Sequence, residues 1–312
     1  MVGNTANMLA SARIQTNQIL TFPFKWLYGA ERSIMNEQKV DTAIERLRLA
    51  DQMSRKYMDS PLYVCISGGK DSSVIQQIAV ESGLEVIFHH NHTTVDAPET
   101  VYFIRSEFAR LRELGYRTQI LYPKMSMWQL IESKNGMPPL RIMRYCCRYF
   151  KERPITCDSG KKAFIVTGVR WAESTSRKQR AEFEAIAKNK QNAVRIAAND
   201  NELSRKLFED CRLRGERVCN PIIDWSDDDV WKFLNERGLP VNPLYSMGYK
   251  RVGCIGCPMS PLAQRLEQFE RYPKYRQAYI NAIDRGLTRG RTLGKDYTWE
   301  CGKECFDWWM NR

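Results

Sequence analysis

The stretch LYVCISGGKDSS, residues 62–73, decides the fold of this 312-residue chain. Its first half is a short apolar run, which is typical of a buried strand, and its second half opens a helical pattern that continues through Ser82. Two glycines at the turn let the backbone approach a phosphate closely, and the free N–H groups at a helix start favour an anion. The stretch therefore predicts a strand, a phosphate-binding loop and a helix, in that order.

The side chains of this loop add the chemistry that a nucleotide site needs. Its candidate nucleotide-binding residues are Ser67, Gly68, Gly69, Lys70, Asp71, Ser72 and Ser73. The serines supply hydroxyl donors, Lys70 supplies a positive charge, and Asp71 can hold Mg²⁺ through oxygen. The spacing is neither that of a Walker loop nor that of a G-x-G-x-x-G fingerprint.

Strands alternate with helices on both sides of this stretch. Further strands are expected at 84–91, 118–123, 162–169 and 218–225, and helices at 38–58 and 97–114. This alternation predicts an α/β fold with a doubly wound parallel sheet of about five strands and crossover helices on both faces.

Three regions follow from the pattern. They are a helical N-terminal arm over 1–60, a nucleotide-binding α/β domain over 61–225 and a helical C-terminal region over 226–312. Residues 171–216 are dense in Arg, Lys and Ser, and we expect a basic, solvated loop there. An apolar content of 43% excludes a disordered chain.

The net charge of the chain indicates what kind of molecule it binds. The net charge of +12 favours polyanions, so an adenine nucleotide and DNA or RNA are the expected partners. No apolar run is long enough for a membrane span, and the first residues lack an export pattern, so a cytoplasmic protein without membrane partners is expected. The sequence is compatible with a homo-oligomer and with a monomer.

Several motifs together resemble one family. They are SGGKDS at 67–72, DAPET at 96–100, GVRWAES at 168–174 with Arg177, and NPIIDW at 220–225 followed by DVW at 229–231. The loop resembles the PP-loop of the ATP pyrophosphatase (adenine nucleotide alpha-hydrolase) superfamily. The other motifs resemble those of phosphoadenosine phosphosulfate (PAPS) reductases, over roughly residues 60–260.

The resemblance implies a function for each motif. Members split ATP between the α and β phosphates or bind adenylyl-sulfate nucleotides, so Lys70, Asp71 and Ser72 are the expected catalytic residues, with ATP and Mg²⁺ as cofactors. Gly168, Arg170 and Arg177 would lie at the nucleotide, where guanidinium groups suit phosphate or sulfate. Ser226 is expected to cap the helix that follows it.

Four cysteines form a candidate metal site. They are Cys146, Cys147, Cys254 and Cys257. Tetrahedral Zn²⁺ with four thiolates is one interpretation. The CC…C-x-x-C pattern also resembles the [4Fe–4S] site of iron–sulfur sulfonucleotide reductases and of DNA-phosphorothioation ATP pyrophosphatases, which makes the cluster the preferred interpretation.

The three histidines, His89, His90 and His92, stand at the carboxyl end of the second strand, where doubly wound sheets bind ligands. A metal trio, polar filling and contact with adenosine are the alternatives. We expect this segment to line the nucleotide pocket, with His90 as its nucleotide-binding residue.

The C-terminus separates the functional hypotheses. Reductases of the resembled family carry a catalytic cysteine in a terminal E-C-G-[LI]-H motif. Here Glu300, Cys301 and Gly302 are present without the histidine, so Cys301 is a weaker candidate nucleophile. The preferred function is an ATP pyrophosphatase in sulfur transfer, with a nucleic-acid acceptor as in phosphorothioation and a cysteine desulfurase or another sulfur-donor protein as partner. The alternatives are an adenylyl-sulfate or PAPS reductase that forms sulfite and a non-catalytic nucleotide-binding regulator.

Overall fold

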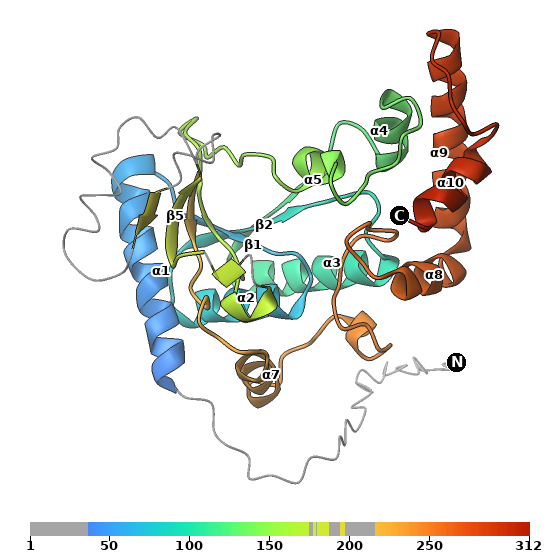
Figure 1. Ribbon diagram of the computed structural model, residues 1–312. Helices are drawn as coiled ribbons and strands as arrows, with labels where there is room; N and C mark the ends of the chain where they lie inside the picture. The colour runs from blue at the N-terminus through green and yellow to red at the C-terminus, as the bar shows by residue number, and fades with distance from the viewer. Residues whose placement is uncertain (1–36, 175–176, 179, 187–193, 197–215) are drawn as a thin grey trace, which may run out of the picture. The chain divides into compact units, whose positions relative to one another are not determined.

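A computed structural model of the protein describes residues 37–174, 177–178, 180–186, 194–196 and 216–312 (Figure 1). The expected N-terminal arm before Glu37 therefore lies outside the described residues. The described strands form one sheet, in the order β3-β2-β1-β4-β7-β5-β6. Their bounds are β1 Leu62–Cys65, β2 Val86–Asn91, β3 Arg117–Leu121, β4 Phe164–Val166, β5 Phe183–Ile186, β6 Val194–Ile196 and β7 Glu216–Cys219.

Five of these strands are the five expected from the sequence. β1, β2, β3, β4 and β7 pair in parallel, with Leu62 opposite Val86 and Tyr63 opposite Ile165 in the two ladders of β1. The expected α/β fold with a doubly wound parallel sheet is confirmed.

The basic insertion differs from its expected loop. Within it, β5 pairs antiparallel with both β7 and β6 and extends the sheet at one edge. These strands are three and four residues long. Runs that short between charged residues carry no detectable period of two, which is why the sequence pattern missed them.

Helices cover the middle of the sheet, where β1, β2 and β4 are almost entirely buried. α1 (Glu37–Met58), α2 (Lys70–Glu81), α3 (Pro98–Glu113) and α7 (Asp227–Glu236) share one buried cluster with strand residues such as Val64 and Phe88. The opposite face of β1 and β2 packs Tyr63 and Ile87 against the segment 155–163. Figure 1 shows α2, α3 and α7 on one side of the strands and α4 (Met127–Ser133) and α5 (Tyr145–Phe150) on the other.

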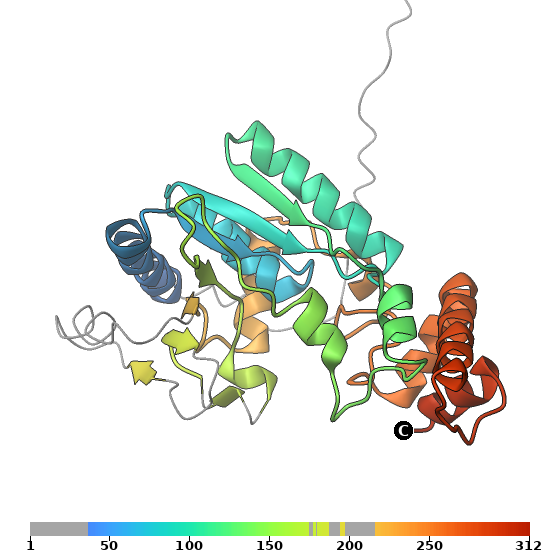
Figure 2. The ribbon, with the colours of Figure 1, turned by 90° about the horizontal axis from the view of Figure 1, so that it is seen from above.

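The C-terminal region is helical, as expected, and has its own core. α8 (Leu262–Arg271), α9 (Pro273–Thr292) and α10 (Gly302–Met310) bury Phe269, Tyr279 and Trp309 together with the apolar side of α4. α9 and α10 run side by side (Figure 2). Among the helices of the described ranges, none has the length and apolarity that crossing a membrane requires.

Candidate functional site

The predicted phosphate loop lies at the switch point of the sheet. β1 leads to the loop and α2, and its neighbour on the other side, β4, leads to Gly168 and Arg170. Ligands of doubly wound sheets bind at this point, outside the carboxyl ends of the strands. α2 begins at Lys70, and its N-cap residue Gly69 has no side chain that could cap the first amide groups of the helix. This is the arrangement that favours an anion at the helix start.

Hydrogen bonds from a distant segment fix the loop. Gly68 has φ of +78°, and a side chain there would contact α3, so only glycine suits the turn. The amide of Asn242 donates to the Gly68 carbonyl at 3.0 Å. The hydroxyl of Tyr245, on the short 3₁₀ helix η4 (Pro243–Tyr245), accepts from the Lys70 backbone N–H at 2.9 Å. Burial raises the pKa of Tyr245 to about 12, so its hydroxyl stays protonated at neutral pH.

Four charged side chains form a ring beside the loop. Lys70 Nζ lies 3.0 Å from Asp71 Oδ1 and 2.9 Å from Asp227 Oδ1. Arg170 donates from Nε to Asp71 Oδ1 at 2.6 Å and from Nη2 to Asp227 Oδ1 at 2.7 Å. Hydrogen bonds from Lys70 first, and then from Arg170, hold the pKa of Asp227 below its usual range. Two cations thus meet two carboxylates at the start of α2.

This ring changes the expected part of two residues. Arg170 is completely buried, and its Nη1 also donates to the Trp225 carbonyl at 3.0 Å. Its guanidinium therefore orients Asp71 and Asp227, and its predicted contact with phosphate stays a prediction. Asp71 is engaged by two cations, so its carboxylate does not fit direct Mg²⁺ ligation in this arrangement.

Gly168 and Arg177 belong to the same motif as Arg170. Gly168 is needed for close packing, because a side chain there would come within 2.9 Å of the Asp71 carbonyl oxygen. Arg177 pairs with Glu173, four residues earlier, and keeps 30% of its side chain exposed. The Arg177 guanidinium is partly exposed and paired with Glu173, and its predicted contact with the nucleotide stays a prediction.

The four predicted metal-ligand cysteines converge. Cys146 and Cys147, on α5, and Cys254 and Cys257, before α8, line one cavity together with Lys151 and other residues. Gly256, with φ of +70°, makes the tight turn between the last two, and its amide donates to Gln268 at 3.0 Å. Four thiol groups around one cavity fit a cluster or a tetrahedral metal ion.

The surroundings of this cavity favour the thiolate of Cys147, whereas burial raises the pKa of Cys254. The pKa of Cys147 is lowered to about 6, chiefly by a hydrogen bond from the Cys146 thiol and also by the nearby Lys151 and Arg144, while burial acts in the opposite direction. The same hydrogen bond raises the pKa of Cys146. Lys151 is exposed. The pKa of its ammonium group is raised, chiefly by the negative charge of the nearby Cys254 thiolate. A bound cation would replace the proton that the adjacent pair shares.

Comparison with known proteins identifies the family. Residues 61–260 match the model of the phosphoadenosine phosphosulfate reductase domain. The chain belongs to this family. This match confirms the predicted membership of the PAPS reductase family within the PP-loop superfamily. It also confirms that the protein is an enzyme of the PP-loop and PAPS reductase type.

Relatives of this PAPS reductase family member differ in length. The chain is 32% identical to an adenosine 5'-phosphosulfate reductase of Lysinibacillus sphaericus, over 69% of this chain and 79% of that protein. It is 27% identical to an uncharacterised protein of Methanocaldococcus jannaschii over 75% of its own length but only half of that relative. A PAPS reductase structure from Candida auris has a TM-score of 0.39 at 18% identity, covering 71% of this chain and 96% of the other.

Family motifs outside the loop are placed as follows. Ser226 caps α7 and accepts from the Asp229 amide at 3.1 Å, as expected. Cys301 stands at the start of α10, where it is exposed, while α10 is anchored by the buried Phe306 and Trp309. The candidate nucleophile Cys301 is therefore exposed just before a helix that packs through its other residues.

The side chains of His89 and His90 point to opposite faces of the sheet, so the three histidines do not form one cluster. His89 and His90 are buried in β2, with 2% and 5% exposure, rather than lying in a loop. Successive strand residues face opposite sides, so His89 contacts Gln119 and Asn91 while His90 contacts the carbonyl of Ile66, just before the phosphate loop. Burial lowers the pKa of both imidazoles.

Sequence reasoning missed three residues that complete the PAPS reductase-like site. Asn242 and Tyr245 hold the phosphate loop, and Asp227 joins the charged ring. Only the Asn-Pro pair at 242–243, a helix-start signal, marked the first two. Asp227 lies in the first turn of α7, where a carboxylate complements the helix dipole.

Proposed function

We propose that the protein is an ATP pyrophosphatase that adenylates an acceptor so that sulfur can be attached to it. One observation carries the proposal, namely the start of α2 without a side-chain cap and with Lys70 in its first turn. Amide dipoles and an ammonium group at this place stabilise negative charge on phosphates and on a departing pyrophosphate.

The proposed reaction has two steps. An oxygen of the acceptor attacks the α-phosphorus of ATP, the bond from that phosphorus to the bridging oxygen breaks, and pyrophosphate leaves. A sulfide sulfur then displaces AMP from the adenylated acceptor. On binding of ATP we expect Lys70 to exchange its carboxylate partners for phosphate oxygens, with Arg170 retaining Asp71 and Asp227 in place. Mg²⁺ is expected to arrive bound to the nucleotide phosphates.

The four cysteines supply the sulfur side of the proposal. A [4Fe–4S] cluster, when bound by Cys146, Cys147, Cys254 and Cys257, can bind or pass on sulfide. Lys151 and Arg144 offset the negative charge of the thiolates. Zn²⁺ is the alternative occupant. The net charge of +12 supports a DNA or RNA acceptor and a phosphorothioation-like or thiolation-like reaction.

A reductase is the second candidate, supported by the relatives that are named adenosine 5'-phosphosulfate reductases. In that reaction the Cys301 thiolate would attack the sulfur of the nucleotide and displace AMP, and a thiol reductant would release sulfite. The lack of the terminal histidine after Cys301 is the reason for placing this candidate second.

Pyrophosphate release from ATP by anaerobically purified protein tests the proposal, with duplex DNA or tRNA and sulfide present. Lys70→Ala should abolish release, and Lys56→Ala, which removes an exposed lysine of α1, should leave it unchanged. Sulfite formation from adenylyl sulfate or PAPS that is lost in Cys301→Ser would establish the reductase instead. Nucleotide binding without either product would support the regulator.

The nucleic-acid part has its own test. Affinity for duplex DNA or tRNA should fall steeply between low and physiological salt, because Lys and Arg contacts to phosphates release counterions. Binding that is indifferent to salt would contradict a phosphate-contacting surface and leave the nucleotide chemistry unaffected.

A further inference from the structure

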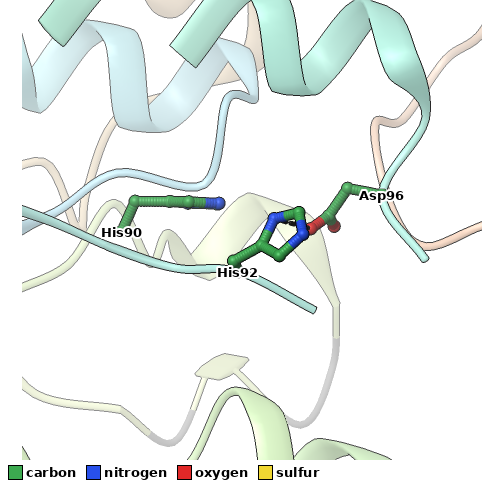
Figure 3. Close-up of side chains that lie close together, drawn as sticks. All are labelled: His90, His92 and Asp96. Atoms are coloured by element: carbon green, nitrogen blue, oxygen red, sulfur yellow. Dashed lines mark ion pairs between the residues drawn. The ribbon is translucent and has the colours of Figure 1, made fainter. Parts of the chain in front are cut away.

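Three potential metal ligands converge at the carboxyl end of β2 and in the segment that follows it, apart from the four cysteines. They are His90, His92 and Asp96, whose ligand atoms all lie within 4.8 Å of one another (Figure 3). Two nitrogens and one carboxylate oxygen are a ligand set typical of divalent first-row transition metals. The cluster contains Asp96 in place of the third histidine of the sequence, because His89 points to the other face of the sheet.

Two of the three ligands are already oriented by hydrogen bonds. The partner of His90 Nδ1 is the Ile66 carbonyl at 2.8 Å, and since a carbonyl can only accept, Nδ1 carries the proton and Nε2 carries the lone pair. Asp96 Oδ2 accepts from the Thr93 backbone N–H at 2.9 Å. Carbonyl-bound imidazoles and amide-bound carboxylates are the usual outer contacts of metal ligands. Both residues are more than nine-tenths buried.

The third ligand, His92, lies close to the Asp96 carboxylate. His92 Nδ1 lies 3.6 Å from Asp96 Oδ2, which is longer than the roughly 2.7–3.2 Å of an N–H···O hydrogen bond. Two ligand atoms bound at about 2.1 Å to one tetrahedral ion are about 3.4 Å apart. The spacing lies within the range of an ion pair and also fits two ligands of one ion, and His90 faces the same space (Figure 3).

We propose that His90, His92 and Asp96 bind a divalent transition-metal ion of borderline softness, such as Zn²⁺ or Fe²⁺. Mg²⁺ is disfavoured because two of the three ligands are imidazole nitrogens. Three protein ligands leave a coordination position open, as in catalytic rather than structural sites.

The three residues lie close to both the phosphate loop and the four-cysteine cavity. His90 bonds to Ile66, which precedes the phosphate loop, and Asp96 forms an isolated β-bridge with Cys254 of the four-cysteine cavity. Thr93 lines that cavity and also orients Asp96. An ion bound here would lie between the phosphate loop and the cysteines, with its open position available to an oxygen or sulfur ligand. The proposal does not depend on which nucleotide reaction the protein catalyses.

Anaerobic titration of the metal-free full-length protein with Co²⁺ tests the proposal. Thiolate-bound Co²⁺ has sulfur-to-metal charge-transfer absorption, whereas Co²⁺ bound by nitrogen and oxygen has ligand-field bands only, so one titration distinguishes the two sites. The wild type should bind one equivalent of the second kind. His92→Ala and Asp96→Asn should each lose that equivalent and keep the charge-transfer band, and Cys254→Ser should show the reverse.

His89→Gln is the matched control, because it changes a neighbouring histidine of β2 that faces away and can keep its hydrogen bonds. It should retain both kinds of Co²⁺. His92 keeps 20% of its side chain exposed, so His92→Ala is the variant expected to fold normally, which thermal melting checks. A wild type without nitrogen- and oxygen-bound Co²⁺, or retention of that equivalent in folded His92→Ala, would overturn the proposal.

Discussion

Removing the Arg170 guanidinium tests whether charge holds the phosphate loop in place. The side chain has 0% exposure and donates to Asp71, to Asp227 and to the Trp225 carbonyl. Breaking a buried ion pair by deleting one partner typically costs about 3–5 kcal/mol. Here the side chains of Asp71 and Asp227 are 22% and 64% exposed, and both keep Lys70, so water and the ammonium compensate in part. We therefore expect Arg170→Ala to lower the free energy of unfolding by about 2–3 kcal/mol.

The assay is thermal unfolding followed by circular dichroism, together with nucleotide binding. For a domain of this size 1 kcal/mol shifts Tm by about 2–4 °C, so Arg170→Ala should melt roughly 5–10 °C lower. Arg177→Ala is the matched control from the same motif, since its partly exposed pair with Glu173 is of a kind that contributes about 0–1 kcal/mol. Arg170→Lys should be intermediate, because one ammonium cannot replace three directed donors.

Two results would refute this reasoning. A Tm of Arg170→Ala within about 1 °C of the wild type would mean that the charged ring does not stabilise the fold. Equal destabilisation by Arg177→Ala would mean that the measured loss has another origin. If Arg177→Ala leaves Tm unchanged and weakens nucleotide binding, its predicted contact with phosphate or sulfate gains support independently.

Three further variants probe the same loop. Gly68→Ala should cost about 2–4 kcal/mol in urea unfolding, from a φ of +78° and a new Cβ 2.9 Å from a side chain of α3, whereas Gly253→Ala, with open space around it, should cost less than 1 kcal/mol. Tyr245→Phe should cost about 1 kcal/mol, because the Lys70 N–H loses its acceptor, and an unchanged midpoint would contradict that hydrogen bond. The lowered pKa of Asp227 adds stability above about pH 4 that is lost as the pH falls, so Asp227→Asn should be less stable than wild type at neutral pH, with the gap closing in acid; parallel stability curves would argue against it.

The fold could be predicted from the sequence to the extent that strands were apolar and separated by helices. The expected strands at 84–91 and 118–123 match β2 and β3 within two residues, and the expected helix at 97–114 matches α3 within one. β5 could not be predicted in this way, because its pairing with β7 comes from contact across the sheet edge rather than from its own pattern.

The site was predictable in its residue types but only partly in its pairings. Arg170 was assigned to phosphate because guanidinium groups suit that ligand, and nothing in the local sequence marks Asp71 and Asp227 as its partners. Those carboxylates are 99 and 57 residues away along the chain and meet Arg170 only where the loops after β1 and β4 approach α7. An arginine with no exposed surface needs such partners, since an unpaired buried charge is too costly.

The contrast between the cysteines and the histidines has a physical basis. A C-x-x-C turn brings Cys254 and Cys257 close together whatever surrounds it, so the sequence alone indicates a shared ligand site. Adjacent histidines of a strand have the opposite property, because the alternation of side chains separates His89 from His90 however close they are in sequence. The third ligand beside His90 and His92 is Asp96, which begins the DAPET motif at 96–100. If the Co²⁺ titration bears out the site, that segment has a coordinating function that sequence spacing could not reveal, since it depends on the chain turning back after β2.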